Sequence, residues 1–400
     1  MSGPLAGVRV LDLTTFLSGP SATQLLGDLG ADVIKVEPPD GDMTRTVPPH
    51  FVGPDGAYFL ANNRNKRSIA VDLKNPDGAA LVRRLARVVD VVVDNYRPGV
   101  LDRLGLDVAA LRAEHPALIW ASISGFGQEG PWRDKPAYDM IVQALSGAMS
   151  MTGEPDGGPT RLGIPAGDLV AGMYAVIGIL SAYVDRQRTG QGRWVDVAML
   201  DGMLAMLSYQ AVYSTVGGIT PGRQGSRHDS IPTYRTFRGG DDRDLAVTAN
   251  TERMVRALCA VLGVGHLVEE ERFATPAARL AHREELWPLL EKAFTAAPAA
   301  VWVDRLNAAG IPAALITTVP EALQDARESG RGMVRRITHP DGRSVEVLGN
   351  PVAFHGEPQA PFRYPPALGA DADDVLAGLL DLSADDIAAL RASGAVGGAS

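Results

Sequence analysis

Short apolar runs alternate with longer helix-like stretches over the first 130 residues of the chain. The stretch 19–30, for example, has Pro20 near its start and Gly30 at its end, which are typical helix boundaries. Strands that alternate with helices of this length predict a parallel sheet covered on both faces, and therefore an α/β fold. The expected strands are 8–13, 32–37, 68–73, 90–95 and 118–124.

The pattern becomes more helical after residue 138 and changes again near residue 220. A long helix is expected over 169–187, followed by a strand at 193–199 and a helix at 200–214. Beyond residue 220, a loop-like segment leads into strand-like and helical runs that predict a smaller α+β domain. The remaining features are a strand at 311–319, a hairpin from about 332, a proline-rich stretch at 351–367 and a helix at 383–392.

The composition is that of an ordinary soluble globular protein, with 46% hydrophobic and 21% charged residues in a chain of 400. The formal net charge of −9 disfavours a general attraction to nucleic acid or to anionic membranes, so neither partner is expected. The N-terminus lacks the features of a signal peptide. The longest uncharged apolar run, Leu169–Val184, is shorter than the ~20 residues that cross a bilayer. We therefore expect a cytoplasmic protein.

Cysteine and histidine give no sign of a metal site. The single cysteine, Cys259, lies in an apolar run and is expected to be a buried core thiol rather than a nucleophile. The seven histidines are scattered and form no HxxxH or HExxH pair, so no metal site is predicted.

The N-terminal strand, turn, helix and strand have the outline of a dinucleotide-binding unit, with Glu37 as the acid at the end of the second strand. Such a unit needs a GxGxxG turn so that the backbone can approach the pyrophosphate. Here the turn is TTFLSGP, which contains one glycine before a proline. The outline therefore predicts a Rossmann-like fold without NAD binding.

Several polar and basic residues lie at the ends of predicted strands. Lys74 closes the strand at 68–73, whereas Asn95, Arg97 and Arg103 lie at or just past the end of the next one. Open parallel α/β sheets bind ligands outside the carboxyl ends of their strands. These residues are thus candidates to converge on one anionic ligand, although each of them alone is also compatible with a solvated surface charge.

One carboxylate, Asp168, heads the apolar run in GIPAGDLVAGMYAVIGILSAYVD. From the residues alone it is interpreted first as a helix N-cap, although Ala171, three positions on, rules out a capping box. Burial would raise the pKa of Asp168 and the helix N-terminus would lower it, so the direction stays open. The run is apolar on its other faces too, which predicts a buried helix. Small residues along one side predict tight packing against a neighbour: Gly172, Ala175, Gly178 and Ala182.

Five long blocks of sequence support a more specific interpretation. They are PLAGVRVLDLTTFLSGP, LLGDLGADVIKVEPPDGDMTR, NRNKRSIAVDLKNPDG, DVVVDNYRPGVLDRLGLD and GDLVAGMYAVIGILSAYVDRQRTGQGRWVDVAMLD. Together they closely resemble the class III coenzyme A transferases, the family of formyl-CoA transferase and carnitine CoA-transferase. The resemblance runs from residue 4 to about 216 and resumes in HREELW, AAGIPAALITTVPEAL and RGMV.

The resemblance implies an interlocked homodimer in which each subunit is an open ring threaded through the other. A large Rossmann-like domain would be built from both ends of the chain, with the smaller α+β domain inserted between them. The active site would lie at the junction of the two domains. The expected divisions are 1–220 for the first part of the large domain, 221–330 for the small domain and 331–400 for the return to the large domain.

The resemblance also implies the transfer of coenzyme A (CoA) from an acyl-CoA donor to a carboxylate acceptor, with no permanently bound cofactor. The family nucleophile matches Asp168, which would form a mixed anhydride and then an aspartyl-CoA thioester. Backbone N–H groups near the helix start could stabilise the oxyanions, and Gly167 would let backbone and substrate approach closely. The family's CoA contacts match Phe16, Leu17, Ser18, Val71, Lys74, Asn95, Tyr96, Arg103 and Lys135.

Tyr138 and Asp139 bear on the alternative activity, that of an acyl-CoA racemase or epimerase. The related α-methylacyl-CoA racemases move an α-proton and have a histidine followed by aspartate at this position. This chain reads KPAYDMIVQALSG, and a phenol is a poor base at neutral pH, which favours transfer. Both residues are candidate catalytic residues. Asp139 could orient groups near the thioester or serve as a helix-start carboxylate.

Three departures separate the chain from the formyl-CoA branch of the family. Leu17 and Pro38 stand where that branch has a glutamine and an arginine, and its four-glycine loop is missing. Leu17 removes an amide that could bind a small polar acyl group, which disfavours a formyl–oxalate reaction. In the small-domain loop at 225–240, the candidates to meet the acceptor, or to be plain surface residues, are His228, Tyr234 and Arg235.

Overall fold

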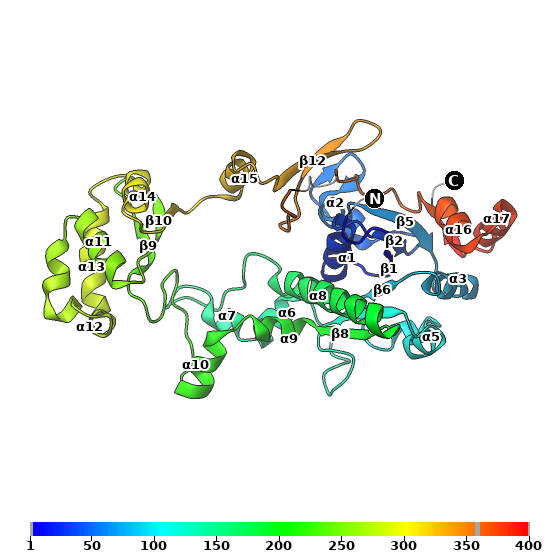
Figure 1. The fold of residues 1–400 in the computed structure, drawn as a ribbon, viewed down its shortest axis with the longest axis horizontal. Coiled ribbons are helices and arrows are strands. Elements are labelled where there is room, and N and C mark those ends of the chain that lie inside the picture. The colour runs from blue at the N-terminus through cyan, green and yellow to red at the C-terminus, as the bar shows by residue number, and fades with distance from the viewer. Residues whose placement is uncertain (1–2, 357–360, 399–400) are drawn as a thin grey trace. The chain divides into compact units, whose positions relative to one another are not determined.

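The computed structural model describes residues 3–356 and 361–398, and the chain forms two compact units (Figure 1). The first unit comprises Met1–Met149, Arg161–Ile219 and Ser329–Ser400, and the second comprises Ser150–Thr160 and Thr220–Glu328. The second unit therefore interrupts the first in sequence, as an inserted domain does. It also takes residues 150–160, which the sequence pattern leaves in the large domain.

A seven-stranded sheet forms the centre of the first unit. Its strands are β1 (Arg9–Asp12), β2 (Asp32–Glu37), β5 (Lys66–Val71), β6 (Val91–Asp94), β7 (Ile119–Ser124), β8 (Trp194–Ala198) and β14 (Val396–Gly397). They lie in the order β14-β5-β2-β1-β6-β7-β8, and all neighbours are parallel except β14, which pairs antiparallel with β5. The predicted α/β fold with a mainly parallel sheet is confirmed. The chain runs outward from β1 through β2 and β5 and then returns to β6 on the other side of β1.

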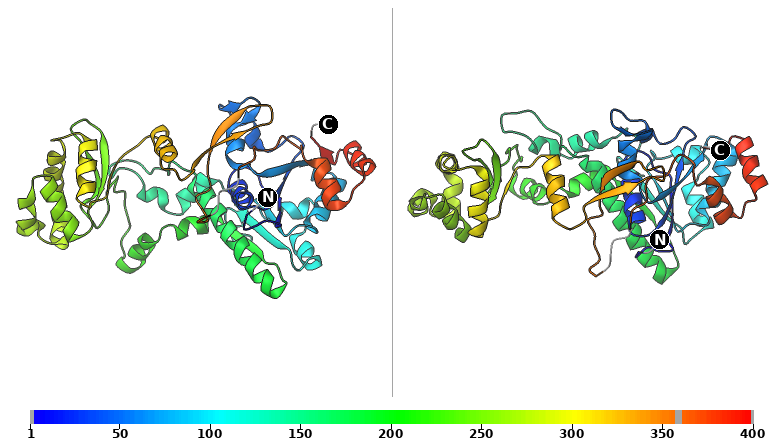
Figure 2. Two further views of the ribbon diagram at one scale, coloured as in Figure 1. Left: turned by 45° about the horizontal axis from the view of Figure 1, so that its top comes forward. Right: turned by 90° about the horizontal axis from the view of Figure 1, so that it is seen from above.

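Helices cover both faces of this sheet. The helices in this part of the chain are α1 (Ser18–Asp28), α2 (Ala57–Asn62), α3 (Pro76–Ala86), α4 (Val100–Arg103), α5 (Val108–Glu114), α6 (Asp139–Leu145), α7 (Ala148–Met151), α8 (Ala166–Thr189), α9 (Met199–Ala205), α10 (Tyr209–Gly217), α16 (Ala372–Leu380) and α17 (Ala384–Ala392). Of these, α10 has no buried residue and does not cover the sheet. Because successive strand residues point to opposite faces, Val10 packs with α1 and α8, whereas Leu11 packs with α3, α5 and α16. Figure 2 shows α16 beside α3, so the C-terminal residues return to the first unit.

The long helix α8 differs in one respect from its prediction. Its buried residues include Ala171 and Ala175, whereas Tyr174, Ile177 and Val184 are exposed. The prediction that α8 is buried all round is therefore wrong for the single chain. By length and composition α8 could also cross a membrane, but the core helix of a soluble protein passes the same test.

Other expectations are met with altered bounds. The helix expected at 200–214 is two helices, α9 and α10, which meet at Ser208, whose φ is +49°. The hairpin from about 332 is present as β12 (Val334–Thr338) and β13 (Ser344–Leu348), and a small hairpin joins β3 (Phe51–Val52) to β4 (Asp55–Gly56). Part of the expected proline-rich stretch, residues 357–360, lies outside the described residues.

The second unit is an α+β structure with its own core. Its antiparallel sheet has the order β11-β10-β9, and the strand expected at 311–319 is shorter in the structure. Cys259 is buried in this core, as predicted, and burial raises the pKa of its thiol to about 11. The elements are β9 (Tyr234–Arg238), β10 (Asp244–Thr248), β11 (Ala313–Leu315), α11 (Glu252–Val261), α12 (Pro276–Ala281), α13 (Arg283–Phe294), α14 (Ala299–Ala308) and α15 (Val319–Glu328).

Candidate active site

A pocket of about 360 Å³ lies outside the carboxyl ends of β1, β6 and β7. The strand order reverses at β1, and open α/β sheets bind ligands in the crevice at such a point. Loops that follow the three strands form the walls together with the start of α8. The predicted site residues that line the pocket are Phe16, Ser18, Asn95, Tyr96, Lys135, Tyr138 and Asp168.

The loop after β1 is held by the loop after β6. The backbone N–H of Thr15 donates to Asn95 Oδ1 at 2.9 Å, and Asn95 Nδ2 donates to the Thr15 carbonyl at 2.7 Å. The next residue, Phe16, has a φ of +70°, a backbone region that residues with a side chain rarely adopt. Its ring lies 5.7 Å from the Tyr58 ring and 6.2 Å from the Tyr138 ring, centroid to centroid. Asn95 thus fixes the loop from which Phe16 and Ser18 reach the pocket.

A group of buried charged side chains contacts the start of the loop after β1. Lys35 Nζ donates to the Thr14 carbonyl at 2.8 Å and pairs with Asp42 at 2.9 Å. Lys66 Nζ pairs with Asp12 at 3.0 Å, and Asp12 accepts the Thr14 backbone N–H at 2.9 Å. Although burial alone would raise the pKa of Asp12, the charges of Lys66 and Lys35 hold it well below its ordinary value. The loop therefore begins on a set of buried ion pairs and hydrogen bonds.

Asp168 does not cap its helix. It is the third residue of α8, and the N-cap position belongs to Pro165, whose side chain cannot accept a capping hydrogen bond. The interpretation of Asp168 as an N-cap is therefore wrong. A carboxylate that caps its own helix cannot attack a substrate freely, and Asp168 instead lines the pocket.

The pKa of Asp168 is raised from its ordinary value of 3.8 to about 7. Burial is the largest cause, the negative charge of Asp139 adds to it, and a hydrogen bond with the Ser18 hydroxyl opposes it. Burial thus outweighs the helix N-terminus, which answers the question that the sequence left open. At pH 7 such a carboxyl is about half ionised.

Asp139 lies at the start of α6 and holds the start of α8. Its Oδ1 accepts the Gly167 backbone N–H at 2.8 Å, and its Oδ2 accepts Gln143 Nε2 at 2.7 Å. Gly167 is needed here because a Cβ atom would lie 2.6 Å from Val142 Cγ2. The close approach at Gly167 is therefore to α6. Its N–H group donates to Asp139, so it is not one of the backbone N–H groups near the helix start that could stabilise an oxyanion.

The remaining predicted residues lie outside the pocket lining. The side chains of Leu17 and Val71 are buried in the core, 5% and 1% exposed. Lys74 follows β5, and Arg103 ends α4, as their positions after strands suggested. Two arginines also line the pocket, Arg97 and Arg133. Arg97 was among the strand-end candidates for an anionic ligand, whereas Arg133 was not predicted. The position of Arg97 directly after the strand β6 marked it as a possible ligand contact. Arg133 lies in a loop, where no sequence pattern indicated a role for it.

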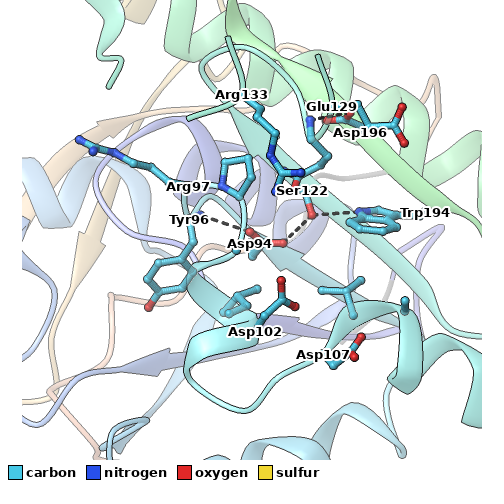
Figure 3. A pocket seen from close by; sticks show the side chains of 16 residues that line it. Asp94, Tyr96, Arg97, Asp102, Asp107, Ser122, Glu129, Arg133, Trp194 and Asp196 are labelled. Atoms are coloured by element: carbon cyan, nitrogen blue, oxygen red, sulfur yellow. Dashed lines mark hydrogen bonds between the residues drawn. The ribbon is translucent and has the colours of Figure 1, made fainter. Parts of the chain in front are cut away.

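A second pocket of about 550 Å³ shares Tyr96, Arg97 and Arg133 with the first (Figure 3). Asp94 lies at its base, where it accepts the Ser122 hydroxyl at 2.7 Å, and burial raises the pKa of Asp94 to about 6. This carboxylate-rich lining suits the phosphates of a CoA ligand less well than the Asp168 pocket does. The carboxylates are Asp94, Asp102, Asp107, Glu129 and Asp196.

The small-domain candidates make contacts within the second unit. The His228 ring stacks on that of Tyr234 at 5.4 Å. Arg235 pairs with Glu291 at 2.6 Å and lies 4.8 Å over the Trp287 ring. These contacts give Arg235 a structural role, and a contact with the acceptor stays a prediction.

Comparison with known proteins identifies the family of the chain. The sequence profile described as CoA-transferase family III matches residues 5–372. The chain is 39% identical to the succinate–glutarate CoA-transferase of Agrobacterium fabrum, over 94% of this chain and 96% of that protein. It is 41% identical to the acetyl-CoA:oxalate CoA-transferase of Acetobacter aceti, over 88% and 90%.

A solved structure shows the same fold. The CaiB/BaiF family protein of Brucella suis superposes with a TM-score of 0.84 at 38% identity, over 95% of this chain and 100% of that one. The fold and the sequence relatives thus agree on one family of CoA-transferring enzymes. The chain belongs to CoA-transferase family III.

Proposed function

We propose that this CoA-transferase moves CoA between two carboxylic acids through a covalent intermediate on Asp168. The observation that carries the proposal is the environment of this carboxyl group. It lines the pocket at the reversal point of the sheet, it does not cap its helix, and its pKa is raised to about 7. A carboxylate with a raised pKa is a better nucleophile than an ordinary one and still ionises at neutral pH.

The reaction exchanges one thioester for another in four additions. The Asp168 carboxylate attacks the donor acyl carbonyl, so that a C–O bond forms, the C–S bond breaks and CoA leaves as its thiolate. The thiolate then attacks the aspartyl carbonyl, which releases the donor acid and leaves an aspartyl-CoA thioester. The acceptor carboxylate attacks this thioester and expels the thiolate. The thiolate finally attacks the acceptor acyl carbonyl of the new anhydride and regenerates Asp168.

The lining of the pocket supports the binding of an anionic ligand. Arg97, Arg133 and Lys135 supply positive charge for phosphates in a chain that is acidic as a whole. Because Asp139 occupies the Gly167 N–H group, we assign the hydrogen bond to the developing oxyanions to the hydroxyl groups of Tyr138 and Ser18, both of which line the pocket.

We propose dicarboxylic acids as the substrates. The relatives are named for succinate and glutarate, for acetyl-CoA and oxalate, and for succinyl-CoA and D-citramalate, so each name includes at least one dicarboxylic acid. These names favour transfer over the racemase alternative. Tyr138 also favours transfer, because it is a phenol at the position where the racemases have a histidine.

Trapping of the intermediate tests the proposal directly. Incubation of the enzyme with succinyl-CoA and hydroxylamine should convert Asp168 to its hydroxamate, because both the anhydride and the thioester react with this nucleophile. Peptide mass spectrometry locates the change, and Asp168→Asn is the matched control that should neither react nor turn over. An active enzyme with an unmodified Asp168 peptide would contradict the covalent route. Loss of α-deuterium from a 2-methylacyl-CoA without any acceptor would favour racemisation instead.

We also propose that the enzyme acts as a homodimer, in the interlocked form that the family resemblance implies. The support is apolar surface on the single chain. Ile177 on α8 is 58% exposed and Val216 on α10 is 81% exposed, and none of the residues of α10 is buried. Large apolar side chains exposed on two helices are the kind of surface that a protein interface covers.

A further inference from the structure

We propose that Gln143 is a positioning residue for Asp168, acting through Asp139 and the segment that leads into α8. The inference rests on the proposed role of Asp168 as the nucleophile and deepens it. It names a residue that does not line the pocket and that no sequence motif singled out.

Gln143 joins two parts of the chain that meet at the start of α8. It lies on α6 and is fully buried, with 0% of its surface exposed. Its Oε1 accepts the Leu162 backbone N–H at 2.8 Å, and its Nε2 donates to Asp139 Oδ2 at 2.7 Å. Nε2 also lies 3.4 Å from the Ile164 carbonyl oxygen. One carboxamide therefore fixes the backbone before the helix and the carboxylate that holds it.

The chemistry of the partners sets the orientation of this amide. Leu162 offers an N–H donor, so the amide must turn its oxygen towards it. Asp139, when ionised, can only accept, so the amide must turn its NH₂ group towards it. Glutamine satisfies both at once, whereas an apolar residue satisfies neither. Buried polar groups left without partners are costly, so Gln143 ties the two contacts into one unit.

The contacts of Gln143 affect Asp168 in two ways. Gly167 is the residue directly before it and donates to the other oxygen of Asp139, so Gln143 and Gly167 together hold Asp139 in one place. Gln143 also fixes where the negative charge of Asp139 lies, and this charge is one cause, after burial, of the raised pKa of Asp168.

Other groups around Asp168 contribute to its environment. Burial and the negative charge of Asp168 raise the pKa of Tyr58 on α2. The Ser18 hydroxyl of α1 forms a hydrogen bond with Asp168. Of these neighbours, Asp139 is the group that accepts a hydrogen bond from Gln143. The remaining titratable side chains of the lining are Arg97, Arg133, Lys135, Tyr96 and Tyr138.

The test compares Gln143→Met with Gln24→Met in the full-length enzyme. Gln24 is the matched control because it is also a buried glutamine with two backbone partners. Its Oε1 accepts the Arg64 N–H at 3.2 Å, and its Nε2 donates to the Ala61 carbonyl at 3.1 Å. Both variants should lose thermal stability, since each leaves backbone groups unpaired. Gln24→Met should keep kcat and its pH profile.

Gln143→Met should lower kcat at least tenfold with a KM for acyl-CoA within about twofold of the parent value, because the basic residues of the lining are untouched. It should also move the acid limb of kcat to lower pH, since a less ordered Asp139 raises the pKa of Asp168 less. If the variant does not fold, Gln143→Asn is used. Its amide is too short to bridge both partners, and the same shifts are expected with smaller size.

Failure of the inference can be told apart from failure of the proposed function. If hydroxylamine labels Asp168 in the parent enzyme while Gln143→Met keeps kcat and the acid limb, the positioning role is overturned and the nucleophile stands. A loss of stability with an unmoved pH profile overturns it in the same way. If the active parent enzyme cannot be labelled at Asp168, the proposed function itself fails.

Discussion

Asp168 lies where two opposing influences meet. The N-terminus of a long helix favours its anion, as does the Ser18 hydroxyl, whereas burial and the neighbouring charge of Asp139 disfavour it. The raised pKa shows that desolvation dominates. A nucleophilic carboxylate benefits from this balance, because it is basic enough to attack and still ionises at the pH of metabolism.

The rate of the first acyl transfer should therefore rise with pH through about 7. The carboxylate attacks in its ionised form, and a raised pKa moves the loss of that form from the ordinary range of a carboxyl group up to neutral pH. The measurement is the single-turnover release of CoA thiolate between pH 5 and pH 9.

Two variants should move the acid limb of this pH–rate profile in opposite directions. Asp139→Asn removes the negative charge and should lower the midpoint, whereas Ser18→Ala removes the hydrogen bond that favours the anion and should raise it. A limb that stays near pH 4, or that neither variant moves, would show that another group controls the rate.

At the scale of elements, the packing of α8 places its first turn. A Cβ atom at Gly172 would lie 2.6 Å from Ser21 Oγ and 2.8 Å from the Ser18 carbonyl oxygen, so this glycine lets α8 approach α1 closely. Gly178 meets a different neighbour, because its Cβ would lie 2.5 Å from Val195 Cγ1 on β8. The predicted tight packing of the small residues is confirmed, but it is shared between two elements.

Gly172→Ala should damage both stability and activity. The added methyl group meets a backbone oxygen that cannot move aside, so about 1–3 kcal/mol of unfolding free energy should be lost. Because α8 is pushed from α1, the contact between Asp168 and Ser18 loosens and kcat should fall several-fold.

Gly378→Ala provides the matched control for this prediction. Gly378 is a helical glycine of α16, and nothing lies within 4 Å of a Cβ placed there. The substitution should stabilise the protein by about 0.5–1 kcal/mol and leave kcat unchanged. Equal effects of the two substitutions, by denaturant unfolding and steady-state assay, would refute the packing argument.

At the scale of the whole molecule, the first unit is built from three separated segments of the chain. β14 pairs with β5, and α16 packs beside α3, so the last residues complete the sheet begun by the first. The apolar surface of α8 and α10 is left open in the single chain. The charge-free run of α8 therefore includes apolar residues that its own chain does not cover.

The enzyme should be a dimer in solution, with about twice the 42.2 kDa mass of one chain by light scattering. Ile177→Asp places a charge on the exposed face of α8 and should yield less dimer, or less soluble protein, than the matched Ile177→Val. A parent enzyme with the mass of one chain at micromolar concentration would contradict the homodimer.

The amino-acid sequence alone was enough for the features that depend on local pattern. The strands of the parallel sheet, the helix at α8 and the buried Cys259 follow from runs of apolar residues, because periodicity reports which side of an element meets the core. The family resemblance singled out Asp168, Phe16 and Lys135 as candidate site residues, and all three line the pocket.

The tertiary structure decided whatever depends on neighbours distant in sequence. The helix start at Ala166, which removes Asp168 from the cap position, follows from the contact between Asp139 and Gly167. The raised pKa of Asp168 needs burial and a charge from another helix, and Gln143 acquires a role only through the partners it joins. The pKa and the position of a side chain such as Asp168 depend on all the groups around it in space, and a sequence pattern does not contain that arrangement.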